Sequence, residues 1–77
     1  MAKVCKKRLV IESGDEYHQA MVNLIDSYLK YKQKQLIFGY SLKDDNKLIW
    51  VTLVFIDDKL FHNLIRWLVD YYGMEEI

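Results

Sequence analysis

The sequence lacks most of the features that stabilise or anchor small proteins. It has one cysteine, Cys5, three glycines and no proline in 77 residues. A single thiol excludes a disulfide bond within the chain and indicates a reducing compartment, so we expect a cytoplasmic protein. The longest nearly apolar run, residues 48–56, is about half as long as a membrane-spanning helix needs to be. The sequence therefore predicts no transmembrane segment and no membrane partner.

The motifs of common catalytic and cofactor sites are also missing. The sequence contains no glycine-rich phosphate loop, no dinucleotide-binding fingerprint and no nucleophile elbow. Cys5, His18 and His62 do not lie at metal-ligand spacing, so we expect no metal and no cofactor. We expect His18 to be a partly buried packing residue and His62 to be solvated. No nucleophile, base and orienting residue can be combined from the sequence, which predicts a protein that is not an enzyme.

What the sequence does contain is a large apolar fraction for its length. Hydrophobic residues make up 52% of the chain and aromatic residues 14%, a composition that excludes a disordered chain. A domain of this size buries only about 60% of its unfolded surface. Small scaffolds without a disulfide or a metal usually depend on a partner. We expect one domain over residues 1–77, with a basic leader at 1–6 and a frayed tail at 74–77.

The spacing of apolar residues predicts two helices and three strands. Asp57 is the expected N-cap of the second helix, and Gly73 is its expected C-terminal cap. The order along the chain is a strand at 7–12, a helix at 15–34, a hairpin with arms at 35–43 and 47–56 around a turn at 44–46, and a helix at 58–72.

This order, β-α-β-β-α, predicts an α+β fold. A right-handed crossover makes the first two strands parallel, and the hairpin makes the third strand antiparallel to the second. The third strand is apolar on both faces, which favours a central position. We therefore expect a three-stranded mixed sheet of order 1-3-2, with both helices on one face. In the hairpin, we expect Lys43 to face Lys47 and Tyr40 to pair with Trp50, a register that depends on the length of the turn.

Two helices cover only one face of such a sheet, whereas the hairpin is apolar on both faces. A homodimer or a larger protein partner would cover the second face, because large exposed apolar patches are rare on monomers. The alternative is that the helices cover the aromatic face and leave only the mildly apolar side around residues 39–41 exposed. Aromatic residues are enriched at interfaces, although in small domains they are more often core residues. The candidate partner-binding residues are Tyr40, Trp50, Trp67 and Tyr71.

The charged residues suggest a second kind of partner. The net charge is zero, but basic residues gather at the start of the first strand and the end of the first helix. This basic pole, close to tyrosines, is a candidate site for a nucleic-acid backbone. The alternative is that these residues are ordinary helix-end cations and a solvated leader. The basic pole consists of Lys3, Lys6, Lys7, Arg8, Lys30, Lys32 and Lys34.

No motif points to a known family, so the functional prediction rests on these surfaces. The apolar excess favours a small non-enzymatic protein-interaction module, a regulator or inhibitor that acts as a homodimer or docks on a larger partner. Regulators of this build are typical of mobile elements and phages. The alternative is a nucleic-acid-binding accessory protein that uses the basic pole. Because a dedicated nucleic-acid module usually carries net positive charge, the first prediction is the stronger.

Overall fold

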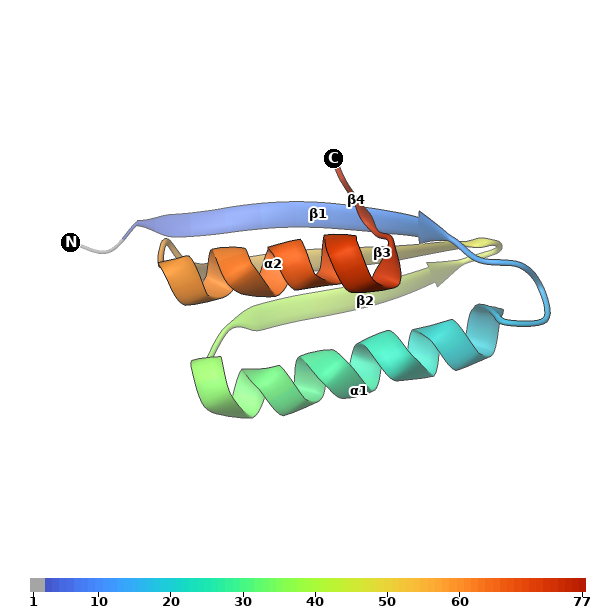
Figure 1. Ribbon diagram of the computed structural model, residues 1–77, viewed down its shortest axis with the longest axis horizontal. Helices are drawn as coiled ribbons and strands as arrows, with labels where there is room; N and C mark the ends of the chain where they lie inside the picture. The colour runs from blue at the N-terminus through green and yellow to red at the C-terminus, as the bar shows by residue number, and fades with distance from the viewer. Residues whose placement is uncertain (1–2) are drawn as a thin grey trace.

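The computed structural model describes residues 3–77 as one antiparallel sheet with two helices on one of its faces (Figure 1). The strand order is β2-β3-β1-β4. The elements are β1 (Val4–Glu12), α1 (His18–Leu36), β2 (Gly39–Asp45), β3 (Leu48–Ile56), α2 (Lys59–Tyr72) and β4 (Glu75–Glu76).

The α+β class, the order of the first three strands and the placement of both helices on one face are as predicted. The predicted three-stranded mixed sheet is wrong, because the sheet in residues 3–77 has a fourth strand, β4, and every pair of neighbouring strands in it is antiparallel. The strands β1 and β2 do run in the same direction, but β3 lies between them. With β4 added, the element and strand orders are those of the ferredoxin-like arrangement. Proteins with this arrangement have many unrelated functions, so the fold assigns none.

Both ends of the domain are more ordered than predicted. The strand β1 begins at Val4, so residues 4–6 of the expected leader belong to the sheet, while Met1 and Ala2 lie outside the described residues. At the other end, Met74 is only 1% exposed, and the Ile77 amide donates to the Arg8 carbonyl at 2.9 Å. The expected frayed tail is therefore part of the sheet, where Glu75 and Glu76 pair with β1.

The two helices begin later than predicted. Residues 14–17 form a turn in which the Tyr17 amide donates to the Gly14 carbonyl at 3.0 Å, so α1 starts at His18. It then continues through Leu36, where a strand was expected. The N-cap of α2 is Asp58 rather than Asp57, and its side chain accepts from the Leu60 amide. The cap at Gly73 is confirmed, since this residue has the left-handed conformation with φ 76°.

The predicted hairpin register is wrong by three residues. The strands are joined by Asn46 and Lys47 alone, so Lys43 pairs with Trp50 rather than facing Lys47. A two-residue turn requires positive φ, which asparagine tolerates, and Asn46 has φ 58°. An odd shift exchanges the two faces of a strand. Tyr40 therefore pairs with Leu53 on the helix-covered face, while Trp50 points to the open face.

Alternating positions of the sheet and one face of each helix form a single core. Leu9, Ile49 and Val51 are fully buried at the centre of the sheet. Ile25 and Leu29 pack onto them from α1. The α2 residues of the same core are Phe61, Leu64, Ile65 and Leu68. Among residues 3–77, neither helix has the length and apolar character needed to cross a membrane.

Candidate functional site

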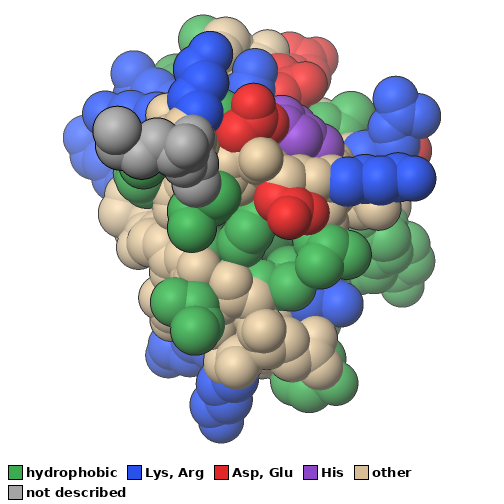
Figure 2. Space-filling model, turned by 90° about the vertical axis from the view of Figure 1, so that its left-hand side faces the viewer, with side chains coloured by type: hydrophobic (Ala, Val, Ile, Leu, Met, Phe, Trp, Pro, Cys, Tyr) green, Lys and Arg blue, Asp and Glu red, His purple; other side chains and the backbone are tan. Residues whose placement is uncertain are grey.

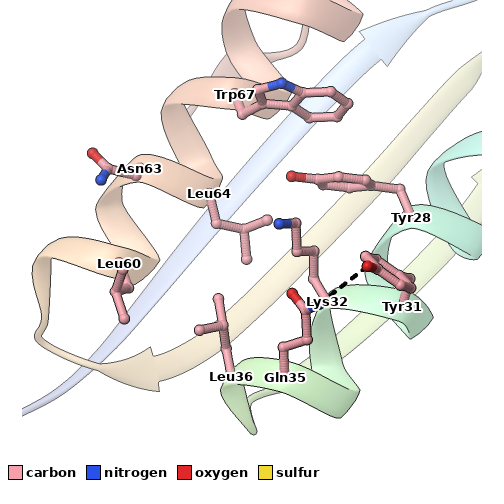
Figure 3. A pocket seen from close by; sticks show the side chains of 9 residues that line it. All are labelled: Tyr28, Tyr31, Lys32, Gln35, Leu36, Leu60, Asn63, Leu64 and Trp67. Atoms are coloured by element: carbon pink, nitrogen blue, oxygen red, sulfur yellow. Dashed lines mark hydrogen bonds between the residues drawn. The ribbon is translucent and has the colours of Figure 1, made fainter.

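A groove with a volume of about 640 Å³ lies between α1 and α2 (Figure 3). Each helix contributes residues at i, i+3, i+4 and i+7, the spacing of one helical face. The lining residues are Tyr28, Tyr31, Lys32, Gln35 and Leu36 from α1, and Leu60, Asn63, Leu64 and Trp67 from α2.

The lining of this groove is apolar with a small polar fraction. Leu64 is 5% exposed and belongs to the core, whereas Leu60 is 57% exposed and Tyr31 59% exposed. Lys32 extends from α1 into the groove (Figure 3), and its Nζ lies 5.8 Å from the centroid of the Tyr28 ring. Within residues 3–77, Lys32 is the only charged residue of the lining. A concave apolar surface with a few polar groups is typical of a binding site.

Stacked aromatic rings close one end of the groove. The Tyr28 and Trp67 ring centroids are 4.1 Å apart, and Tyr71 stacks on the other side of Trp67 at 4.5 Å. Tyr72 meets all three rings edge-on. Burial raises the pKa of Tyr28 to about 12, so its phenol is neutral at physiological pH. The stack of Tyr28 on Trp67 joins α1 to α2.

The structure divides the four candidate partner-binding residues among three locations. Trp67 lines the groove, and Tyr71 stacks on Trp67. Tyr40 lies under α1, where its hydroxyl donates to Asp26 Oδ1 at 3.0 Å. Burial raises the pKa of Tyr40, and the hydrogen bond to Asp26 adds to this shift. Tyr40 therefore fastens β2 to α1, and Trp50 is alone on the open face of the sheet.

The basic pole is also divided among several faces. Lys6 and Arg8 point to the open sheet face, whereas Lys7 lies on the helix-covered face, with its Nζ 3.8 Å from Glu76. Lys30 pairs with Asp26 at 3.1 Å. Hydrogen bonds from Lys30 and then from Tyr40 lower the pKa of Asp26. The other three are Lys3 before β1, Lys32 in the groove and Lys34 in the last turn of α1.

The end of the molecule where β1 begins shows apolar side chains between basic ones at the margin of the view (Figure 2). A shallow depression here is lined by residues of β1, β2, β3 and the segment after α1. Ile37 is 83% exposed and has φ 53°, a conformation that is strained for a β-branched residue. Val4 is 67% exposed, and Ile56 is 48% exposed. The apolar excess is therefore found at this end and in the groove as well as on the open sheet face.

The prediction that no nucleophile, base and orienting residue can be combined is wrong. The Ser13 hydroxyl lies 2.6 Å from His18 Nδ1, and His18 Nε2 is hydrogen-bonded to Asp44. Asp44 is on β2, far away in sequence, so no local pattern indicates this set. Ser13 is only 6% exposed, so a substrate does not reach its hydroxyl in this conformation. The three residues connect the end of β1, the start of α1 and the hairpin.

The second histidine and the cysteine lie outside both the groove and the Ser13–His18–Asp44 set. His62, which was expected to be solvated, has a side chain that is 47% exposed, and its Nε2 lies 2.6 Å from Asp57 Oδ1. The hydrogen bond to His62 lowers the pKa of Asp57. Cys5 is a free, partly buried cysteine. Within residues 3–77, no three His, Cys, Asp or Glu side chains are grouped as metal ligands.

The candidate sites are two surfaces: the groove between α1 and α2, and the open face of the sheet. Their possible partners follow from their shape, charge and exposure alone. Neither a protein-family model, nor a curated protein, nor a solved structure matches this chain.

Proposed function

We propose that this chain is a non-enzymatic protein-interaction module that binds an apolar helical segment of a partner protein in the groove between α1 and α2. The observation that carries this proposal is the open groove itself, with exposed Leu60 and Tyr31 above a floor that includes Leu64. An amphipathic helix laid into an apolar groove is a recurring mode of protein recognition.

The lining also defines the chemistry of the partner. Its apolar part fits aliphatic or aromatic side chains along one face of a helix. Lys32 requires an opposite charge, because an ammonium group that loses water without a partner is costly. The partner helix therefore carries an Asp or Glu that faces Lys32. Gln35 and Asn63 supply neutral hydrogen-bonding groups at the margin.

A regulator or inhibitor would use this groove to hold a segment of a larger protein. In the homodimeric form of the proposal, a second copy of the chain covers the groove. The oligomeric state of the purified protein distinguishes these two forms, since only the homodimeric form gives a concentration-dependent dimer.

The test uses two leucines of equal exposure on the helix layer. Leu60, which lines the groove, is 57% exposed, and Leu24, which does not line it, is 56% exposed. A displayed library of amphipathic helices with one fixed acidic residue is selected against the wild-type protein. We expect the selected helices to bind at least about 10-fold more weakly to Leu60→Glu, a loss of about 1.4 kcal/mol, and equally to Leu24→Glu.

Sedimentation of the same three proteins tests the homodimeric form. A dimer that Leu60→Glu dissociates and Leu24→Glu preserves supports a second copy as the occupant. A monomer from which no helix can be selected, or selected helices that bind Leu60→Glu as tightly as wild type, would contradict the proposal.

The proposal places the protein in the cytoplasm. It is supported by Cys5, a free and partly buried thiol with no partner for a disulfide within the chain. Fractionation of the native cell tests this location, and recovery from an oxidising compartment would contradict it.

A further inference from the structure

The open face of the sheet brings together cationic, aromatic and hydroxyl side chains from three strands. In one row, Lys43 of β2 and Val10 of β1 flank Trp50 of β3. The next row contains Ser41, Thr52 and Arg8. Lys6 lies on the same face of β1, two residues before Arg8 and about 7 Å from it along the strand.

Trp50 is the centre of this surface. The guanidinium carbon of Arg8 lies 5.4 Å from the centroid of its ring, and Lys43 is its direct cross-strand neighbour. The indole is half-buried and has a cation on each side. A shallow pocket of about 290 Å³ is found here, and its lining residues are Arg8, Ser41, Lys43, Asp45, Trp50 and Thr52.

Charge is unevenly distributed along this face. Lys6 and Arg8 lie on the half where β1 begins, whereas Glu12 and Asp45 flank Leu48 at the other end. Glu75 of β4 is opposite Val10. The face therefore attracts an anionic ligand toward Trp50 from the side of Lys6, and it repels that ligand beyond Leu48.

From this arrangement we infer that the open face binds single-stranded RNA, with a base stacked on Trp50 and phosphates held by Lys6, Arg8 and Lys43. Aromatic rings with neighbouring cations bind single strands in this way, because every base has a face that can stack. The hydroxyls of Ser41 and Thr52 lie beside the indole, where they can exchange hydrogen bonds with a ribose 2′-OH. An apolar protein partner fits less well around Trp50, since it would strip water from Arg8 and Lys43 without replacing it. The exposed apolar residues of this face, Val4, Val54 and Ile56, lie at the end where β1 begins, away from Trp50.

This site is on the opposite face of the sheet from the groove between α1 and α2, so the two proposals are independent. The neighbouring basic residue Lys7 provides a matched control. Its side chain is on the helix-covered face beside Glu76, although it lies between Lys6 and Arg8 in sequence. A site on the open face needs Lys6 and Arg8 but not Lys7.

The test is fluorescence anisotropy of a labelled uridine-rich RNA of about 12 nucleotides with the full chain. We expect Trp50→Ala to weaken binding at least about 5-fold and Trp50→Phe, which keeps a ring, to weaken it less. Arg8→Gln and Lys43→Gln each weaken binding and reduce the slope of log affinity against log salt by about 0.7. Lys7→Gln leaves both values unchanged.

A DNA strand of the same sequence distinguishes the two nucleic acids. We expect weaker binding of DNA, and a smaller difference between RNA and DNA in the Ser41→Ala variant. Thermal unfolding of each variant identifies any that fails to fold, in which case Trp50→Phe and Arg8→Gln still decide. Absence of RNA binding at low salt, equal losses in Lys7→Gln and Arg8→Gln, or equal binding of DNA would overturn the inference.

Discussion

Tyr28 of α1 and Trp67 of α2 stack with ring centroids 4.1 Å apart and planes inclined by 20°. This contact joins the two helices and also closes one end of the groove between them. The same residues therefore contribute both to the stability of the helix layer and to the shape of the proposed binding site.

The first prediction concerns the alkaline titration of Tyr28. Burial raises its pKa from the ordinary value of 10.0 to about 12, with a smaller contribution from Tyr72. A raised pKa means that the unfolded chain releases this proton first as the pH increases. The free energy of unfolding is thus at its full value below about pH 10 and decreases as the pH approaches 12.

Ultraviolet absorbance of tyrosinate measures the titration, and chemical denaturation measures the stability. In Tyr28→Phe we expect the latest tyrosine step to disappear and the decline in stability above pH 10 to become smaller. Tyr31→Phe is the control, because Tyr31 is 59% exposed and lies one turn away. A latest step that persists in Tyr28→Phe would contradict the assignment.

The second prediction concerns the unequal contributions of Trp67 and Tyr71. Trp67 is stacked between Tyr28 and Tyr71, whereas Tyr71 is 69% exposed and has one stacking neighbour. We expect Trp67→Ala to lower the free energy of unfolding by about 3 kcal/mol, and Tyr71→Ala to lower it by about 1 kcal/mol. Equal losses in urea denaturation would show that the stack does not join the helices.

The third prediction concerns the strained residue at the end of α1. Ile37 has φ 53° and is 83% exposed, so it contributes little burial while its side chain disfavours its own backbone conformation. Glycine adopts positive φ without this penalty. We expect Ile37→Gly to raise the free energy of unfolding by about 1 kcal/mol.

The control for this variant is Ile37→Ala, which removes the exposed apolar surface but keeps a Cβ. We expect its stability to stay close to that of the wild type. A loss of stability in Ile37→Gly, measured by thermal unfolding, would show that the isoleucine side chain makes contacts that offset its strain.

The fourth prediction concerns Ser13 and His18. Ser13→Ala removes the hydrogen-bond partner of His18 Nδ1 in a largely buried position. We expect the free energy of unfolding to decrease by about 1–3 kcal/mol, because a polar atom is left without a partner. His62→Ala removes the corresponding contact with Asp57 at an exposed site, and we expect a smaller loss there.

The same residues test whether the protein is an enzyme. An accessible serine nucleophile would react with a fluorophosphonate probe at Ser13. Because Ser13 is 6% exposed, we expect no labelling of the folded protein, and no difference between wild type and His18→Ala. Labelling at Ser13 that depends on His18 would instead indicate a hydrolytic site and would contradict a purely interacting role.

Much of the fold was predictable from local patterns. Polar residues recur along 19–33 at helical spacing, and this stripe predicted α1. The predicted start of the helix was too early, because residues 14–17 form a turn. The continuous apolar run of β3 correctly indicated a central strand of the sheet. The two-residue strand β4 is too short to show any periodicity. It pairs with β1 through Glu75 and Glu76, beside the buried Met74.

The candidate sites were less predictable, because they depend on residues that are distant in sequence. Trp67 and Tyr71 were singled out as candidate partner-binding residues, but the position of Trp67 at a groove depends on how α1 and α2 are placed relative to each other. Lys6, Lys7 and Arg8 are consecutive in sequence and yet lie on alternating faces of β1. The prediction of one basic pole did not include this alternation.

The sequence by itself determined the two helices, the first three strands and the order in which these three strands pair, because the period of apolar residues is a local property. Tertiary structure alone decided which face each hairpin residue occupies. The register depends on a two-residue turn at Asn46 and on the core that packs against it, and a shift of three residues exchanges the faces. Tyr40 consequently supports α1 from the core, and Trp50 is left beside Arg8 on the uncovered side of the sheet.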